Sequence, residues 1–526
     1  MPIYDGVRYS QLNGIGTFSI FNTAIIQDVT VFPGNPPLEF GNATSGIIAI
    51  ETDERILDRN TNSLIVSLAN VGFSREQKIN ERQSVKIFTN WQPSAPIKAF
   101  NEEALEDIKS FTSNDLGIYW YGSGEKLNWK VLSYSITEGY RFNFRHPSFQ
   151  GDFNQRKNRT FTSVSVEKPI GKGTLSVNNG FSYSVGDFDY SNVAFQVKKR
   201  DWFSGINYIL PNPTYSVKVG MSYDYRNAQV SGSFHEYFYA LGPEHPTVSL
   251  DESLDVEVLE GFGYAKFFLT NELTLGTGFR KNIPIDDQED YLSGQGNISY
   301  TAGKWVFTSG VGLYHKSGLF ENTGEPFTAQ NFQKTLDIKL DEGGVELALS
   351  FFDKNGEVNG DRYDVYGAEF FTNYRFSTKL RVSGSVTLLE SDNDSDRNFT
   401  SDLTYFVRGN LAYTPGGKRT IESILDARQG TILSEEINAA FDTNLNAFEP
   451  TYAEGGTRLP YYANIGISVS KVAQVTEKLN VIFFASVNNI FDRENIRGYN
   501  YNQDYTSREP SLFSLRTTYF GAVFNF

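Results

Sequence analysis

The segment T-L-S-V-N-N-G-F-S-Y-S-V, residues 174–185, alternates apolar and small polar side chains. On an extended chain this alternation places the two kinds of side chain on opposite faces. The run is longer than typical globular strands of about five or six residues. It matches the roughly nine to eleven residues that a tilted strand needs to cross a bilayer. Because its second face is polar, the segment predicts a membrane-spanning strand that lines water.

The same period-two pattern recurs at 215–225, 380–388 and 461–469. Short turn signals, from Gly122-Ser123-Gly124 to Thr476-Glu477, lie about 30 to 60 residues apart, so each interval holds two strands and a longer loop. The pattern predicts an all-β, antiparallel transmembrane β-barrel of about twenty to twenty-two strands. Strand pairing stays open at 75–125 and 415–460. Residues 101–111 and 420–440 have helix-like spacing, and we expect them to cap a loop or cover the mouth.

The composition of the chain argues against several classes of function. The net charge of −15 argues against a nucleic-acid partner, which would need clustered Lys and Arg. The chain has no Cys, and its four His lack zinc-site spacing. Acidic clusters occur at 286–290 and 392–396. The second begins like a calcium loop but has Arg397 in place of the turn glycine, so we interpret both as solvated loops, with loop-bound calcium as the alternative. No run of 18 apolar residues is present. We therefore expect no enzyme activity, no cofactor and no metal site.

The closing strand also alternates. Phe520, Ala522, Phe524 and Phe526 share one face, and the sequence ends on the last of them. This arrangement resembles the C-terminal signal by which bacterial outer-membrane barrels are recognised and inserted. The resemblance implies the barrel-assembly machinery and outer-membrane lipid as partners.

Residues 1–58 differ in pattern from the rest of the chain, and their motifs resemble a known family more specifically. They contain Asp5-Gly6-Val7, the stretch 26–31 with Gly34 after it, and a run from Phe40-Gly41 through Gly46 to Thr52. These elements resemble the second half of the plug domain of TonB-dependent outer-membrane receptors. Near the other end, V-N-N-I-F-D at 487–492 resembles the motif that precedes the last loop and strand in the same family. Short barrel motifs such as Leu459-Pro460-Tyr461-Tyr462 are similar to motifs in receptors of the Bacteroidota.

The resemblance implies a barrel of about 22 strands at 59–526, a partial plug at 1–58, and a location in the bacterial outer membrane. It implies uptake of a scarce nutrient (a siderophore, corrinoid, metal complex or glycan), driven by the TonB complex. A signal peptide, a TonB box and the first half of the plug are not visible, so we expect the sequence to be truncated at its N-terminus. The alternatives are a passive or leaky channel and a surface adhesin.

Ligand contacts are expected where aromatic and basic residues crowd the predicted extracellular loops. Rings with polar handles suit a small-molecule or oligosaccharide ligand at a barrel mouth. An interfacial aromatic girdle is the alternative for any single ring. The candidates are Arg141, Arg145, His146, His235, Tyr237, Tyr499, Tyr501 and Tyr505.

Overall fold

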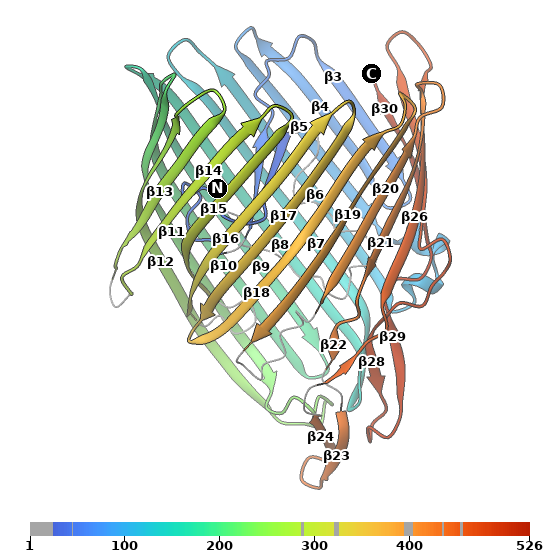
Figure 1. Cartoon of the computed structure of the whole chain (residues 1–526). Coiled ribbons are helices and arrows are strands. Elements are labelled where there is room, and N and C mark those ends of the chain that lie inside the picture. The colour runs from blue at the N-terminus through green and yellow to red at the C-terminus, as the bar shows by residue number, and fades with distance from the viewer. Residues whose placement is uncertain are drawn as a thin grey trace.

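The computed structural model describes residues 25–44, 46–285, 289–319, 326–393, 403–433, 436–452 and 456–526. Within them, 22 strands form a closed barrel in which every neighbouring pair is antiparallel. The barrel closes where β3 (Thr61–Ser67) pairs with β30 (Thr517–Asn525) (Figure 1). The strands between them are β4 (Val71–Asn80), β5 (Gln83–Pro93), β6 (Ile108–Ser123), β7 (Asn128–His146), β8 (Phe149–Ile170), β9 (Gly173–Tyr190), β10 (Val193–Pro211), β11 (Tyr215–His235), β12 (Thr247–Phe268), β13 (Leu273–Ile283), β14 (Leu292–Ala302), β15 (Trp305–Leu319), β16 (Pro326–Glu342), β17 (Val345–Val358), β18 (Asp361–Arg375), β19 (Leu380–Asn393), β20 (Tyr405–Tyr413), β21 (Arg419–Arg428), β26 (Tyr462–Gln474) and β27 (Asn480–Asn488).

Short turns join the strands at one end of the barrel, and longer connections lie at the other. The turns fall at the predicted positions, for example at 171–172 between β8 and β9 and at 343–344 between β16 and β17. The long-loop end carries α1 (Ser94–Phe100), the 3₁₀ turn η2 (Glu103–Leu105) and three small two-stranded sheets. These sheets are formed by β22 (Ile432–Leu433) with β25 (Thr457–Arg458), β23 (Glu436–Asp442) with β24 (Ala447–Tyr452), and β28 (Ile496–Tyr501) with β29 (Arg508–Leu512).

The two helix predictions are wrong. In the first, only the three residues of η2 are helical, and β6 begins at Ile108 and pairs with β7. In the second, residues 419–428 form β21, which is hydrogen-bonded between β20 and β26. Tertiary pairing overrides the local spacing there, because a barrel strand satisfies its backbone groups on both sides.

The two faces of β9 divide as the alternation predicts, whereas on β7 the apolar Leu132, Tyr134 and Ile136 face the lumen. On β9, Phe181 is 48% exposed on the outer wall, whereas Ser182 and Ser184 are 6% and 4% exposed on the inner side. The closing strand follows the same rule, with Phe520 and Phe524 on the outer wall. No helix in the described ranges is both long enough and apolar enough to span a membrane.

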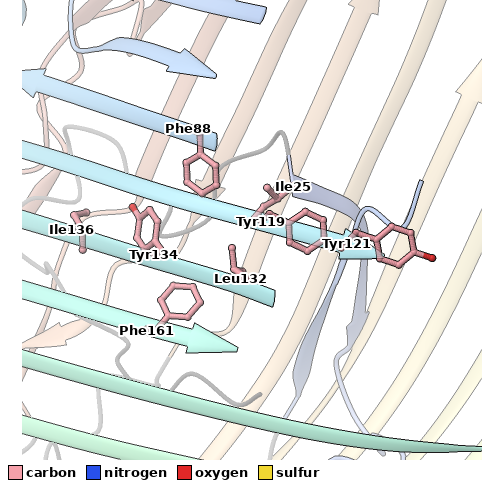
Figure 2. Close-up of a cluster of buried hydrophobic side chains, with 8 residues drawn as sticks. All are labelled: Ile25, Phe88, Tyr119, Tyr121, Leu132, Tyr134, Ile136 and Phe161. Atoms are coloured by element: carbon pink, nitrogen blue, oxygen red, sulfur yellow. The ribbon is translucent and has the colours of Figure 1, made fainter. Parts of the chain in front are cut away.

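Residues 25–58, called the luminal segment below, lie inside the barrel (Figure 1). The segment contains a separate antiparallel sheet of β1 (Ile26–Phe32) and β2 (Ile47–Thr52). Ile25 is 1% exposed and packs on an apolar patch of the inner wall. Figure 2 shows this cluster, whose other members come from β5 to β8: Phe88, Tyr119, Tyr121, Leu132, Tyr134, Ile136 and Phe161.

Candidate functional site

A buried ion pair on the barrel wall holds the tip of the luminal segment. Arg280 on β13 and Glu260 on β12 point inward and are joined by a 2.7 Å contact, with side chains 3% and 4% exposed. Arg280 Nη1 also donates to the carbonyl oxygens of Leu38 and Glu39, at 3.0 and 3.4 Å. The guanidinium therefore forms its ion pair with Glu260 on the barrel wall and donates further hydrogen bonds to the luminal segment.

Glycine is required where the segment passes this guanidinium. A Cβ added at Gly41 would overlap the Nη2, Cζ and Nε atoms of Arg280. Gly41 is one of the predicted plug-motif glycines, and its role is to allow the close approach of backbone to side chain.

Gly41→Leu is expected to displace the luminal segment, because the added side chain and Arg280 cannot occupy the same space. Limited proteolysis of the purified barrel should then cleave within residues 33–44, which resist cleavage in the unsubstituted protein. The matched control is Gly296→Leu on β14, where φ is not positive and an added Cβ meets nothing within 4 Å. Equal protection of 33–44 in the two variants would contradict the packing role of Gly41.

Amide side chains on the inner wall satisfy the backbone of the same tip. Gln295 accepts a hydrogen bond from the N–H of Leu38 at 2.6 Å. Gln333 accepts from the N–H of Asn35 at 3.0 Å and donates to the carbonyl of Thr44 at 2.7 Å. Because the tip has no regular secondary structure, the barrel takes over the hydrogen bonds that a strand would otherwise make.

A second ion-pair cluster lies where the segment leads into the barrel. Asp53 is 2% exposed, and Arg55 and Lys86 contact its two carboxylate oxygens at 2.8 Å each. The hydrogen bonds from Arg55 and then Lys86 hold the pKa of Asp53 well below its usual range, despite its burial. Tyr119 OH donates to the backbone carbonyl of Asp53 at 2.8 Å. The segment is thus fastened at its tip and at its exit.

Aromatic rings line the inner wall at the long-loop end of β7 to β11. Tyr190 packs against Phe144 at 5.1 Å, against Phe153 at 5.6 Å and against His235 at 5.7 Å between ring centroids. Phe188 stacks on Phe195 at 4.8 Å with an interplanar angle of 11°. We call this set the aromatic wall: Phe142, Phe144, His146, Phe149, Phe153, Phe188, Tyr190, Phe195, Phe234 and His235.

Two long loops meet over this wall. The loop 236–246 joins β11 to β12, and residues 442–447 belong to the connection between β21 and β26. Ten barrel strands separate the two loops on one side and twelve on the other, so they reach across the mouth from nearly opposite sides. Ala240 and Ala447 are 0% and 2% exposed in one cluster with Tyr239. We call this contact the loop bridge.

Polar contacts fasten the loop bridge. His245 Nε2 lies 2.9 Å from the carbonyl oxygen of Leu445, and its Nδ1 accepts from the N–H of Gly242 at 2.8 Å. Tyr239 OH donates to Asp442 at 3.2 Å. Desolvation and the bond to Asp442 raise the pKa of Tyr239. Backbone hydrogen bonds from Asn444 and Leu445 lower the pKa of Asp442. The bridge therefore joins a neutral phenol to an ionised carboxylate at neutral pH.

The structure separates the predicted ligand residues into four places. His146 and His235 lie in the aromatic wall, and Tyr237 packs against the loop bridge. Arg141 and Arg145 lie on the outer face, in ion pairs with Asp152 and Asp107 respectively. Tyr499, Tyr501 and Tyr505 lie on and beside the β28–β29 hairpin, where Arg508 covers the Tyr499 ring at 3.9 Å.

The plug-motif residues also fall in different places. Asp5 and Gly6 lie outside the described residues. A Cβ at Gly46 would come within 2.7 Å of the carbonyl oxygen of Phe32, and one at Gly34 within 3.3 Å of Thr335. Within the described ranges, no cluster of three or more His, Asp or Glu side chains is arranged to hold a metal ion.

No protein-family model matches this sequence, and a comparison with curated proteins found no match either. Solved structures do match the fold. The chain is similar to the ferric yersiniabactin uptake receptor FyuA of Yersinia pestis, with a TM-score of 0.73 and 14% identity. It is also similar to the copper transporter OprC (TM-score 0.69, 12% identity) and to a mutant of the ferric enterobactin receptor PfeA of Pseudomonas aeruginosa (0.69, 13%). Each match covers 95% of this chain and 85% of the other.

These likenesses, at such low identity, concern the fold. The barrel and its luminal segment define the chain as a 22-stranded barrel with its lumen partly filled. The fold is that of the TonB-dependent receptors, as the motifs at both ends of the sequence predict.

Proposed function

We propose that this protein is an outer-membrane receptor of the TonB-dependent type, which takes up a scarce nutrient across the outer membrane. Residues 1–58 belong to its plug and residues 59–526 form its barrel. The observation that carries the proposal is the fastening of the luminal segment to the inner wall by Arg280, Gln295 and Gln333. A segment held across the lumen by buried polar groups would obstruct a passive pore.

The aromatic wall favours an aromatic metal chelate of the siderophore class as the ligand. Its rings offer flat apolar contacts, and His146 and His235 add polar edges. Two structurally similar proteins are the ferric yersiniabactin uptake receptor FyuA and the ferric enterobactin receptor PfeA, which agrees with this class. The ligand is captured at the mouth, and the TonB complex, acting on the plug from the periplasm, supplies the energy for its passage.

Binding and uptake test the proposal directly. Purified protein is titrated with ferric enterobactin, with a cupric salt and with a maltooligosaccharide while tryptophan fluorescence is followed. Uptake of radioactive iron from ferric enterobactin is compared in cells with and without the gene and with and without TonB. Saturable binding of the ferric chelate and TonB-dependent uptake are expected. If only the cupric salt or only the maltooligosaccharide binds, the ligand belongs to that class and not to the siderophores. Uptake that does not depend on TonB would indicate a passive channel.

Substitution in the aromatic wall is expected to weaken this binding. Phe153→Ala with Tyr190→Ala removes two adjoining rings and should raise the Kd for ferric enterobactin about tenfold, since aromatic contacts are worth about 0.5–1.5 kcal/mol each beyond area burial. Fluorescence titration measures the change. The control is Phe351→Ala with Phe370→Ala, two rings on the outer wall that are each 43% exposed. An equal loss in the control would show that the effect does not arise at the mouth.

A further inference from the structure

On the outer face of β10, aromatic side chains give way to basic ones along a line at Trp202. Trp202 on β10 is 53% exposed and lies beside Phe181 and Tyr225 on the neighbouring strands. Two residues further toward the long-loop end, Arg200 occupies the same outer face, and Lys198 follows it. In a barrel, such a step from aromatic to charged side chains marks the level of the lipid headgroups.

Three cations gather above this line. Arg200 lies over the ring of Tyr183 at 5.9 Å, Lys198 is opposite Val185, and Arg156 on β8 is opposite Asp187. Asp187 accepts a hydrogen bond from Gln196 at 2.6 Å. Within the part of the chain that the structure describes, no carboxylate lies within ion-pair distance of Arg156, Lys198 or Arg200. By contrast, Arg141 on the same outer surface is ion-paired.

An apolar groove lies on the same wall on the bilayer side of these cations. Its volume is about 530 Å³, and its lining includes Ile206, Val219, Met221, Gly261, Phe279 and Ile283. A Cβ at Gly261 would meet nothing within 4 Å, so the floor of the groove is open to an occupant. Ile206 and Arg200 are on the same face of β10, six residues apart, which is about 20 Å along the strand.

We propose that this face binds a phosphorylated lipid of the outer leaflet. An acyl chain lies in the groove, and the phosphate groups at the headgroup contact Arg156, Lys198 and Arg200. The charges are complementary, because the three cations have no carboxylate partners and a phosphate accepts charge-assisted hydrogen bonds from them. The groove and the cations are separated by about the length of an acyl chain. The inference rests on the outer-membrane location proposed above, and not on the nutrient that is taken up.

Native mass spectrometry of the detergent-purified protein tests the site, with bisphosphorylated lipid A and its dephosphorylated form as probes. The triple variant R156Q/K198Q/R200Q is expected to lose about tenfold in apparent affinity for lipid A. The matched control is K126Q/K172Q/K379Q, which removes three exposed cations at the short-turn end and makes the same change in net charge. This control should bind lipid A as the unsubstituted protein does.

Several outcomes would overturn the proposal. They are equal losses in the two triple variants, equal binding of the dephosphorylated lipid, or displacement of lipid A by millimolar inorganic phosphate alone. A further arm, V219D/M221D, places charge in the groove and should reduce binding of both lipid forms. Uptake of ferric enterobactin is measured in parallel. Loss of lipid binding with intact uptake supports the lipid site, whereas failure of uptake in the unsubstituted protein bears on the proposed function instead.

Discussion

Arg280→Met is expected to change the purified protein from a nearly silent barrel into a conducting one. The substitution removes the donors to Leu38 and Glu39 and leaves Glu260, 4% exposed, without its cation. Removing one partner of a buried ion pair costs about 3–5 kcal/mol, so the anchored state of the luminal segment should lose most of its advantage. Single-channel recording in a planar lipid bilayer measures the result, and sensitivity of cells to a large antibiotic provides a second readout.

The control for this variant is Arg381→Met. Arg381 also faces the lumen and donates to Asn373 at 2.7 Å, and no hydrogen bond or ion pair joins it to the luminal segment in the described residues. This variant should remain silent. Equal conductance of the two variants, or high conductance of the unsubstituted protein, would mean that the luminal segment does not close the pore.

The sequence was a good guide to the barrel because its two physical signals are local. Strand alternation depends only on which face of each strand meets lipid, and Gly171 and Gly343 mark turns through positive φ angles. The helix-like spacing of Ile421, Ile424 and Leu425 misled because residues four apart also share a face of a strand; Ile421 and Leu425 do so on β21, and Ile424 lies on the opposite face. Only the pairing of β21 with β20 and β26 decides between helix and strand.

The site was less predictable. His146 and His235 were chosen as aromatic-rich loop residues, and they do come together, although their sequence positions gave no sign of it. Arg141 was chosen on the same grounds and lies on the outer face, because its side-chain parity on β7 is opposite to that of His146. Arg280 and Glu260 were missed. An isolated charged residue on the polar face of a strand was the available signal, but its partner in the luminal segment is visible only in three dimensions.

The loop bridge leads to the other large effect. Because the chain has no Cys, a pair introduced at Ala240 and Ala447 can form only one intramolecular disulfide. Both positions are buried in the same contact between loops from opposite sides of the mouth. If a ligand must separate these loops to reach the aromatic wall, oxidation of Ala240→Cys/Ala447→Cys should abolish nearly all uptake of ferric enterobactin, and a reductant should restore it.

The matched control joins two positions within one loop. Ala440 and Glu449 are exposed register partners in the β23–β24 hairpin, so Ala440→Cys/Glu449→Cys creates a disulfide that does not cross the mouth. Radioactive iron uptake is measured before oxidation, after oxidation and after reduction, and disulfide formation is followed by gel mobility. Oxidised control cells should retain uptake. If the cross-mouth pair is fully oxidised and uptake persists, ligand reaches the aromatic wall by a path that leaves the loop bridge closed; if both pairs block uptake, the cause lies in the hairpin itself.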